Sequence, residues 1–383
     1  MGAELFRFLL PKFGWNLIIS GILNACRGAI MRIAITGICG FVGSTIAIQL
    51  SERFPGMSIT GIDNFVRAGS EHNRLRLIKR GIRVLHGDVR CASDVNQLPI
   101  TDVVIDAAAN ASVLAGTAGT DVRNLFDTNL VGTLNILDYC RNCKAGLVLL
   151  STSRVYSQQP LEAIPLFNQN SRYALDTSQS LPVGVSLNGI SELFPTGAPV
   201  SLYGASKLAS ETIALEYGAA FDFPVWINRC GVLTGGGQFG VASQGIFAYW
   251  INRYLHKQPL RYTGFDGNGF QVRDILHPAD LLTLILKQIA QPSSAGGVLN
   301  VGGGPKNAVS LCELSHWCQE RFGHHSVSSD PGARPYDVPY LVIDSRIATE
   351  LLGWLPEMTS NDILNDIAEH AIANDNWLEV SAA

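Results

Sequence analysis

The sequence is poor in charge and has no concentration of either sign. Charged residues make up 16% of the 383 positions, the formal net charge is -4, and no long basic run occurs. Binding to nucleic acid or another polyanion rests on clustered lysine and arginine, so we expect neither as a partner. Hydrophobic residues make up 47% of the chain, which is enough for a large core in one or two globular domains.

The cysteines form no recognisable framework. Eight are scattered along the chain, and a chain of this length needs no disulfides to fold. Cys140 and Cys143 have the C-x-x-C spacing, but no second pair or suitably spaced histidine completes a zinc site. Cys312, His316 and Cys318 fit the packed face of a helix better than a metal site. We therefore expect reduced thiols, no bound metal and a cytoplasmic location.

Residues 1–30 imitate a targeting segment only loosely. Arg7 and Lys12 lead into an apolar run at residues 13–23, which is too short to span a bilayer comfortably. Met31 follows at once and begins a strand pattern. We expect residues 1–30 to be an upstream mis-start or a disordered extension, and we expect no membrane partner.

From Arg32 onward, short β-branched runs alternate with helical segments. This alternation is typical of a parallel sheet covered by helices on both faces. Strands are expected at residues 32–36, 58–62, 83–85, 103–107, 147–151, 225–228 and 298–301, and the longest helix at residues 121–141. The sequence therefore predicts an α/β fold with a Rossmann-like, doubly wound parallel sheet.

The chain divides into two lobes in this interpretation. Residues 31–235 form the Rossmann domain, and residues 236–383, where helices dominate, mainly form a smaller substrate-binding lobe. Residues 271–303 are expected to return to the Rossmann sheet. Residues 157–200 are rich in proline and serine without a clear period, and an insertion of that length is usually functional or disordered.

A glycine-rich turn between the first strand and its helix predicts a dinucleotide site. The residues of this G-x-x-G-x-x-G turn that we expect to bind the cofactor are Gly37, Cys39, Gly40, Phe41, Val42 and Gly43. Glycines there let the backbone approach a pyrophosphate, which rests on the amides and positive dipole of the helix start.

Two aspartates follow at the ends of the next two strands. Asp63 is placed to bind the ribose 2′-hydroxyl of NAD and to repel the 2′-phosphate of NADP. Arg67 lies close by and can soften that repulsion, but NAD remains favoured. Asp88 is placed to contact the adenine, although an ordinary turn aspartate is an equally good interpretation.

Tyr203 and Lys207 are four residues apart in a predicted helix and so project from one face. Lowering a phenol pKa from about 10 to about 7 needs roughly 4 kcal/mol. One lysine at about 4 Å supplies a contribution of that order at an effective dielectric of about 20. Alone, the pair is more often an ordinary solvated helix face, so the surrounding motifs must decide whether it is a base.

Taken together, these motifs resemble the extended short-chain dehydrogenase/reductases, in the branch of NAD-dependent nucleotide-sugar epimerases and dehydratases. By that resemblance Tyr203 is the catalytic acid/base, Lys207 lowers its pKa and holds the nicotinamide ribose, and Thr152 binds the reacting sugar hydroxyl. NAD would stay bound and be recycled at each turnover.

The resemblance also implies further contacts. Cofactor contacts fall on Asp63, Asn64, Arg67, Asp88, Val89, Ala107, Ala108, Ala109, Asn129, Ser151, Tyr203, Lys207 and Arg229. Substrate contacts fall on Asn110, Ser153, Arg154, Val232, Gln238, Gln244, Arg273 and Arg334. Arg273 and Arg334 would grip the substrate diphosphate, because guanidinium groups suit phosphate oxygens; an ordinary solvated arginine is the alternative for Arg334.

Within this branch the chain is most similar to the CDP-paratose 2-epimerase subgroup. The resemblance rests on residues 229–235, 237–240, 244–245 and 271–274 and on the long insertion before Tyr203. It implies inversion of C2 of a CDP-sugar through transient oxidation to a ketone. Many relatives have an asparagine where this chain has Val232, so the nucleotide and the sugar stay open.

Other activities compete with this prediction. Dehydratases carry an Asp-Glu pair directly after the active-site threonine, whereas Ser153 and Arg154 follow Thr152 here. A UDP-sugar 4-epimerase is the main alternative, because no motif reports how the sugar is oriented. A net dehydrogenase that releases its cofactor and a non-catalytic dinucleotide sensor are less expected. The family also implies a homodimer or higher oligomer through the two long helices flanking the sheet.

Overall fold

The computed structural model describes residues 30–116, 121–291 and 296–382. The predicted N-terminal extension, apart from Ile30, lies outside the described residues. Of the helices in the described ranges, none combines the length and the apolar character that crossing a membrane would require.

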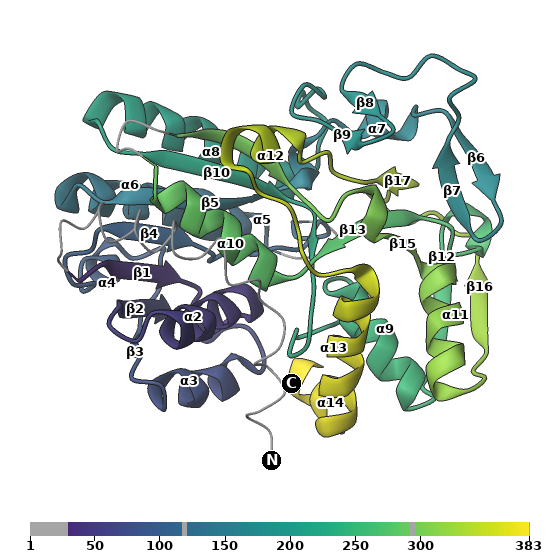
Figure 1. The fold of residues 1–383 in the computed structure, drawn as a ribbon, viewed down its shortest axis with the longest axis horizontal. Helices are drawn as coiled ribbons and strands as arrows, with labels where there is room; N and C mark the ends of the chain where they lie inside the picture. Colours follow the sequence, from purple (N-terminus) through teal and green to yellow (C-terminus); the bar gives the residue numbers. More distant parts are fainter. Residues whose placement is uncertain (1–29, 117–120, 292–295, 383) are drawn as a thin grey trace.

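The fold is built on a seven-stranded sheet whose neighbouring strands are all parallel. Its order is β14-β10-β5-β4-β1-β2-β3 (Figure 1). The strands are β1 (Arg32–Thr36), β2 (Ser58–Asp63), β3 (Arg83–His86), β4 (Val103–Asp106), β5 (Gly146–Thr152), β10 (Val225–Cys230) and β14 (Gly297–Val301). Each coincides with a predicted strand to within about two residues, so the predicted Rossmann-like sheet is confirmed.

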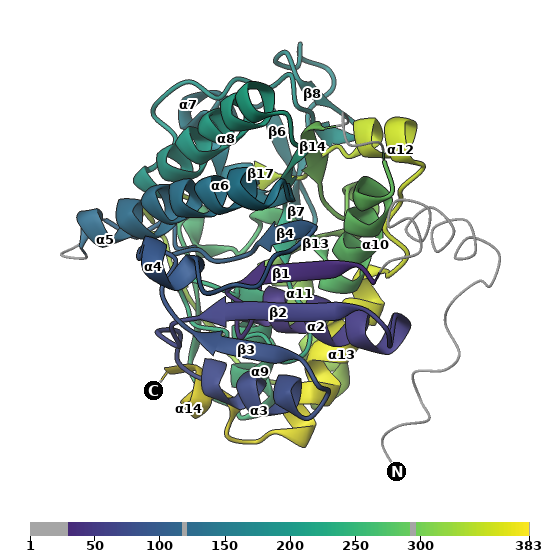
Figure 2. The same ribbon diagram turned by 90° about the vertical axis from the view of Figure 1, so that its left-hand side faces the viewer.

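Helices cover both faces of this sheet (Figure 2). Ile33 and Ile35 of β1 pack with α2 (Phe41–Arg53) and α10 (Pro278–Ile289) on one face. Ala34, which points the other way because side chains alternate along a strand, packs with α6 (Gly132–Cys143) and α8 (Leu202–Phe221). The remaining helices of this domain are α3 (Ser70–Ile78), α4 (Ala92–Val95), α5 (Val122–Phe126) and α12 (Arg346–Leu352). The predicted homodimer or higher oligomer through two long helices flanking the sheet stays a prediction.

The long helix predicted at residues 121–141 is not one regular α-helix. Between α5 and α6 the chain forms a π-helical turn, Asp127–Val131. Such turns are rare and often occur at functional sites. This one carries Asn129.

A second sheet lies beside the first and contains β11 (Val232–Leu233), β13 (Val272–Leu276), β15 (Ala308–Ser310) and β17 (Tyr340–Leu341). The expectation that residues 271–303 return to the Rossmann sheet is therefore only partly right. Residues 272–276 pair in the second sheet, and the return consists of α10 and β14. A short apolar run does not specify which sheet edge it will join.

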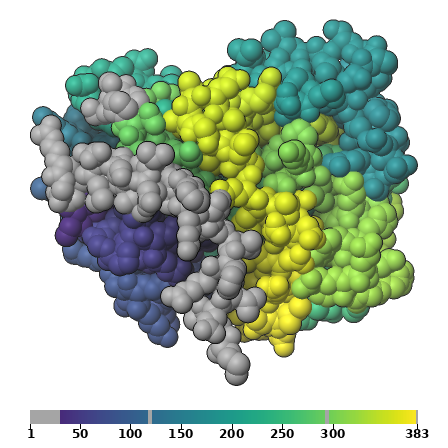
Figure 3. Space-filling view, viewed as in Figure 1, coloured from purple at the N-terminus to yellow at the C-terminus, as the bar shows by residue number. Residues whose placement is uncertain are grey.

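The rest of the second lobe consists of helices and a strand pair. These elements are α9 (Ile246–Leu255), α11 (Leu311–Phe322), α13 (Ser360–Ala373), α14 (Trp377–Ala382), β12 (Leu260–Thr263) and β16 (Val327–Asp330). Figure 3 shows the C-terminal residues (yellow) lying between the Rossmann domain (purple and blue) and the remainder of this lobe (light green).

The insertion is ordered rather than structureless. It contains α7 (Gln158–Glu162) and two hairpins, β6 (Leu166–Gln169) with β7 (Arg172–Leu175) and β8 (Val185–Ser186) with β9 (Gly189–Ile190). Its apolar side chains pack with β17 and the residues just after it. These strands have two to four residues, which is too short to produce a readable period.

Candidate active site

A cavity of about 1060 Å³ lies between the two lobes, at the carboxyl ends of the sheet strands. In parallel α/β sheets this edge is where ligands bind. The predicted residues that line it are Gly37, Gly40, Phe41, Val42, Gly43, Asp63, Asn64, Arg67, Val89, Ala107, Ala108, Ala109, Asn110, Ser151, Thr152, Ser153, Arg154, Tyr203, Val232, Gln238, Gln244, Arg273 and Arg334. Cys39, Asp88, Asn129, Lys207 and Arg229 are not among the lining residues.

The glycine turn forms a tight cradle whose own backbone leaves no room for side chains on Gly37 or Gly43. A Cβ atom on Gly37, whose φ is +61°, would lie 2.9 Å from the Ala108 Cα, and one on Gly43 would collide with the Gly37 carbonyl oxygen. Gly40 caps α2 without a side-chain hydrogen bond. The first amides of α2 thus lie at the cavity wall, which suits an anionic pyrophosphate.

Asp63 is held against this turn by the backbone. Its Oδ2 accepts the Cys39 N–H at 2.8 Å and its Oδ1 accepts the Phe65 N–H at 2.8 Å. Burial raises the pKa of Asp63, and these N–H groups oppose the rise. Cys39 therefore contributes its amide to the position of Asp63, while its thiol is buried.

Arg67 lines the cavity and also contacts the second lobe; its expected part in cofactor binding stays a prediction. Its guanidinium donates to the Phe239 carbonyl and, at 3.3 Å, to Gln244 Oε1. Both partners belong to the second lobe. Arg67 therefore joins the two lobes beside the cavity, and a role in accommodating a 2′-phosphate finds no support in these contacts.

Thr152 and Tyr203 meet where β5 ends and α8 begins. The Ser201 hydroxyl accepts the Gly204 N–H at 3.0 Å and starts α8. Gly204 is needed because a Cβ there would collide with the Arg154 carbonyl oxygen. This close approach places the Tyr203 phenol within hydrogen-bonding reach of Thr152.

The electrostatics of Tyr203 differ from the sequence-based expectation. Burial raises the pKa of Tyr203 to about 12, while the hydrogen bond with Thr152 and the charge of Arg154 lower it. Lys207, one turn further along α8, is itself buried, which lowers its pKa, and the carboxylates of Asp106 and Glu211 raise it. The cation whose charge lowers the pKa of Tyr203 is thus Arg154. The expected effect of Lys207 on Tyr203 stays a prediction.

Asn129 organises the backbone around this pair. Its Oδ1 accepts the Asn110 N–H at 2.8 Å, and its Nδ2 donates to the Asn110 carbonyl at 3.1 Å and to Ser206 Oγ at 2.9 Å. The π-helical turn therefore ties the loop after β4 to α8. Asn129 fixes one wall of the cavity without lining it.

Arg229 lies in a buried ion pair behind the cavity. Its Nη2 is 2.7 Å from Glu211 Oε2, and the side chains of Arg229 and Glu211 are only 10% and 3% exposed. Ser151 donates its hydroxyl to the same carboxylate. Arg229 was expected to bind the cofactor, but these contacts give it a structural position between β10 and α8.

The Glu211→Gln substitution should lower the free energy of unfolding by about 2 kcal/mol, because a buried guanidinium would lose its counter-charge. Urea unfolding measures this loss, and the exposed Glu216→Gln substitution on the same helix is a matched control. An unchanged unfolding midpoint would show that the pair contributes nothing to stability.

Three arginines gather at the far end of the cavity. Arg273 Nη2 lies 2.7 Å from Asp337 Oδ1, and Arg154 Nη1 donates to the Tyr336 carbonyl at 3.1 Å. Burial and the neighbouring charge of Arg273 lower the pKa of Arg154 to about 10. With Arg334 the cluster has three positive charges against the one negative charge of Asp337, and the excess suits a diphosphate.

Several lining residues escaped the sequence analysis. Arg90, Asn124, Tyr336 and Asp337 all line the cavity. Asp337 stands in the same Arg-Pro-Tyr-Asp run as Arg334, so it could have been found there. Arg90 directly follows the predicted Asp88–Val89 pair. Asn124 has no comparable signal.

The sequence model of the NAD dependent epimerase/dehydratase family matches residues 33–302. The chain belongs to this family. The glycine cradle and Asp63 fit NAD, the cofactor of the family. In the described residues no group of histidine, cysteine, aspartate and glutamate is placed to hold a metal ion.

Individual family members are similar over nearly the whole chain. The CDP-paratose 2-epimerase of Salmonella typhi is 30% identical over 87% of this chain and 96% of its own length. A UDP-glucose 4-epimerase of Corynebacterium glutamicum is 26% identical over 90% of this chain and 95% of its own length. The crystal structure of a mutant UDP-glucuronic acid 4-epimerase from Bacillus cereus superposes with a TM-score of 0.73 at 22% identity, covering 90% of this chain and 99% of that one. That likeness supports the fold.

Proposed function

We propose that this family member is an NAD-dependent isomerase that inverts C2 of a CDP-sugar, in the manner of a CDP-paratose 2-epimerase. The observation that carries the proposal is the arrangement around Thr152. Tyr203 and Thr152 meet in one cavity with an arginine cluster, and Ser153 and Arg154 occupy the positions where dehydratases have acidic residues. The similarity to the Salmonella typhi enzyme supports the choice of C2 and of CDP.

The chain's own residues would act in a defined order. Arg154, Arg273 and Arg334 bind the diphosphate and so fix one end of the substrate. Thr152 orients the reacting hydroxyl, and Tyr203 accepts its proton. The glycine turn and Asp63 would hold NAD, which would supply a hydride acceptor for the oxidation and a hydride donor for the reduction. Lys207 would hold the nicotinamide ribose of the cofactor and lower the pKa of Tyr203.

Inversion then requires the intermediate to turn. The diphosphate stays on the arginines while the keto-sugar rotates about its link to the phosphate and presents its other face. Tyr203 gives the proton back to the oxygen as the carbon is reduced. The oxidation and the reduction cancel, so the reaction consumes no external oxidant or reductant and leaves the base in its starting state.

C4 inversion of a UDP-sugar is the second candidate, supported by the similarity to the Corynebacterium glutamicum enzyme. The same base and the same hydride exchange serve either carbon, because the diphosphate anchor does not fix which hydroxyl faces Tyr203.

The test is to incubate the purified protein with CDP- and UDP-sugars without added NAD and to follow the products by NMR and the absorbance of NADH. We expect a CDP-sugar inverted at C2 and no accumulation of NADH. Stoichiometric release of NADH would overturn the isomerase assignment. A product that has lost one water molecule would indicate a dehydratase. Inversion of UDP-sugars at C4 alone would show that the protein is a 4-epimerase and not a 2-epimerase.

A further inference from the structure

The C-terminal helix α14 holds Trp377 against a loop that walls the cavity. This wall loop comprises residues 235–240, of which Gln238 and Phe239 line the cavity. Trp377 Nε1 donates to the Gln238 carbonyl at 2.9 Å, and the rings of Trp377 and Phe239 are stacked with their centroids 5.2 Å apart. Trp377 is only 7% exposed and does not itself line the cavity. It therefore contacts the wall and not the space inside.

Helix α13 holds the other end of the wall loop. Asp366 Oδ2 accepts the Gly236 N–H at 2.6 Å and lies 3.3 Å from His277 Nε2. The loop lies so close to α13 that a Cβ atom on Gly236 would be 2.9 Å from the Asp366 carbonyl oxygen. The His370 ring packs edge-on against Trp377, with centroids 4.5 Å apart. The two C-terminal helices thus contact the wall loop at both of its ends.

The Rossmann domain contacts the same loop from the opposite side. The Arg67 guanidinium donates to the Phe239 carbonyl. A Cβ atom on Gly69, which precedes α3, would lie 2.6 Å from the Phe239 ring and 2.9 Å from Val380 Cγ1 of α14. Phe239 is therefore enclosed between the start of α3 and α14, at a point where the two lobes meet.

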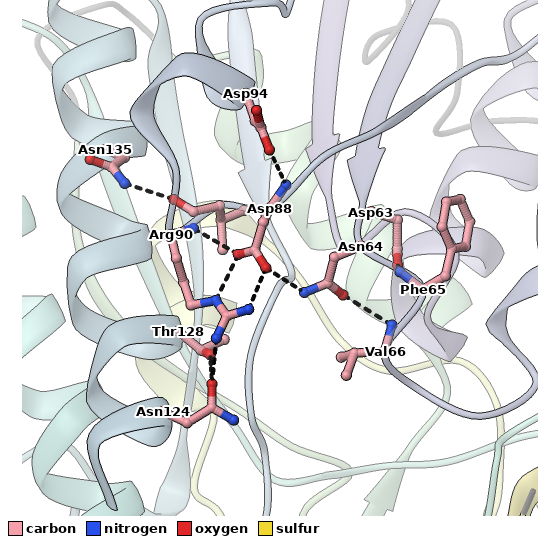
Figure 4. Close-up of polar contacts among 11 residues, drawn as sticks. Asp63, Asn64, Phe65, Val66, Asp88, Arg90, Asp94, Asn124, Thr128 and Asn135 are labelled. Carbon is pink, nitrogen blue, oxygen red and sulfur yellow. Dashed lines mark hydrogen bonds and ion pairs between the residues drawn. The ribbon is translucent and has the colours of Figure 1, made fainter. Parts of the chain in front are cut away.

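The Rossmann side of this contact is braced within its own domain (Figure 4). Asn64 Oδ1 accepts the Val66 N–H at 3.1 Å, and Asn64 Nδ2 donates to Asp88 Oδ2 at 3.0 Å. Asp88 is in turn paired with Arg90 at 2.6 Å. Helix α14 has only six residues, and a short element opens at low cost because few contacts must break. The side that opens more easily is therefore α14.

We propose that Trp377 is a positioning residue that holds the wall loop closed over the cofactor, so that α14 sets how fast NAD enters and leaves the cavity. The loop closes against the segment that follows Asp63, and both line the cavity. A ligand between two lobes leaves when they separate locally, and the open fraction depends on the contacts that must break. None of the contacts of Trp377 involves the cofactor, so losing them should ease entry as well as exit.

The first test measures how fast bound NAD exchanges with radiolabelled NAD in the full-length protein, together with the equilibrium affinity for NAD. Trp377→Ala should exchange NAD about tenfold faster. Its affinity should change by a smaller factor, because entry is accelerated as well. An unchanged exchange rate, or a loss of affinity as large as the gain in exchange rate, would overturn the proposal.

A conservative pair of variants separates this role from general stability. Trp377→Phe keeps a ring contact and loses the N–H donor, so its exchange should be about threefold faster than wild type. Trp354→Phe is the matched control, because Trp354 is also buried and its Nε1 donates to the Asp280 carbonyl at 2.9 Å, but it does not line the cavity. This control should exchange NAD at the wild-type rate. Equal acceleration in both variants would contradict the proposed role of Trp377.

The second test holds α14 against α3 by a covalent bridge and does not depend on whether Trp377→Ala folds. Glu71 of α3 and Glu379 of α14 line one small cavity between these helices. Glu71→Cys combined with Glu379→Cys and bridged by a short bismaleimide should exchange NAD more slowly than wild type. Glu379→Cys alone, treated with the same reagent, controls for labelling, including that of the exposed Cys91. Equal exchange rates in the bridged protein and this control would refute a gating role for α14. Neither test needs a sugar, so both are independent of which carbon the protein inverts.

Discussion

The Tyr203→Phe substitution is expected to lower turnover about 1000-fold while the protein keeps its NAD. In the proposed mechanism the phenolate oxygen of Tyr203 takes the proton from the sugar hydroxyl, and a positioned acid or base of this kind contributes on the order of 10²–10⁴ in rate. The ring itself stays in place, because Tyr203 packs with Ala115 and Leu125. Single-turnover kinetics together with the dinucleotide content of the purified variant measure both effects.

Tyr156→Phe is the matched control for this substitution. Tyr156 is also buried, and its hydroxyl donates to Asn300 Oδ1 at 2.6 Å, but it does not line the cavity. This variant should lose some stability and keep its turnover. If Tyr203→Phe retained wild-type turnover, Tyr203 would not be the base.

The Arg273→Ala substitution is expected to lower kcat/KM about 100-fold, mainly through KM. Hydrogen bonds to charged groups are worth about 1.5–3 kcal/mol, and a 100-fold change corresponds to about 2.7 kcal/mol. Asp337 adds to the loss, because without its partner it leaves a negative charge beside the expected diphosphate. Initial-rate kinetics with the identified nucleotide sugar measure the change.

A double-mutant cycle separates the two contributions. Arg273→Ala combined with Asp337→Asn should recover part of the lost affinity, because the repulsion is removed although the binding arginine is still missing. Arg321→Ala, on the exposed side of α11, is the control for loss of a positive charge. An unchanged KM in Arg273→Ala would place the diphosphate elsewhere.

The strands of the sheet could be predicted from the sequence, because each strand is recognised from the pattern of a few neighbouring residues. Each buried parallel strand is a short β-branched run, and all of these runs were found. Membership of a sheet is not local, which is why residues 272–276 were assigned to the wrong one. Their partners include Ala308–Ser310 and Tyr340–Leu341, far along the chain.

In the candidate site, too, residues identified by a local pattern could be placed, whereas contacts with distant residues could not. Thr152, Asp63 and the glycine turn could be placed because each lies at the carboxyl end of a strand of the sheet. The contacts of Arg67 and Arg229 could not be predicted, because they depend on residues that only folding brings close. These residues are Phe239 and Gln244 for Arg67 and Glu211 for Arg229. The same is true of Arg90, whose orientation depends on Asn124 in a separate helix.

The electrostatics of Tyr203 also could not be derived from spacing. The i, i+4 spacing of a lysine does not report how deeply the phenol and the ammonium are buried, and burial by itself raises the pKa of a phenol. Here burial dominates and raises the pKa of Tyr203 to about 12. The charge of Arg154, which lies in the turn after β5, counteracts this effect.

In the proposed mechanism the hydrogen leaves one sugar carbon and returns to the same carbon inside the protein. The most direct measurement uses a CDP-sugar carrying deuterium at C2, incubated with the protein in ordinary water without added NAD, and follows the product by NMR. We predict that the inverted product keeps its deuterium at C2. Replacement of that deuterium by solvent hydrogen, or inversion at another carbon, would contradict the proposed mechanism.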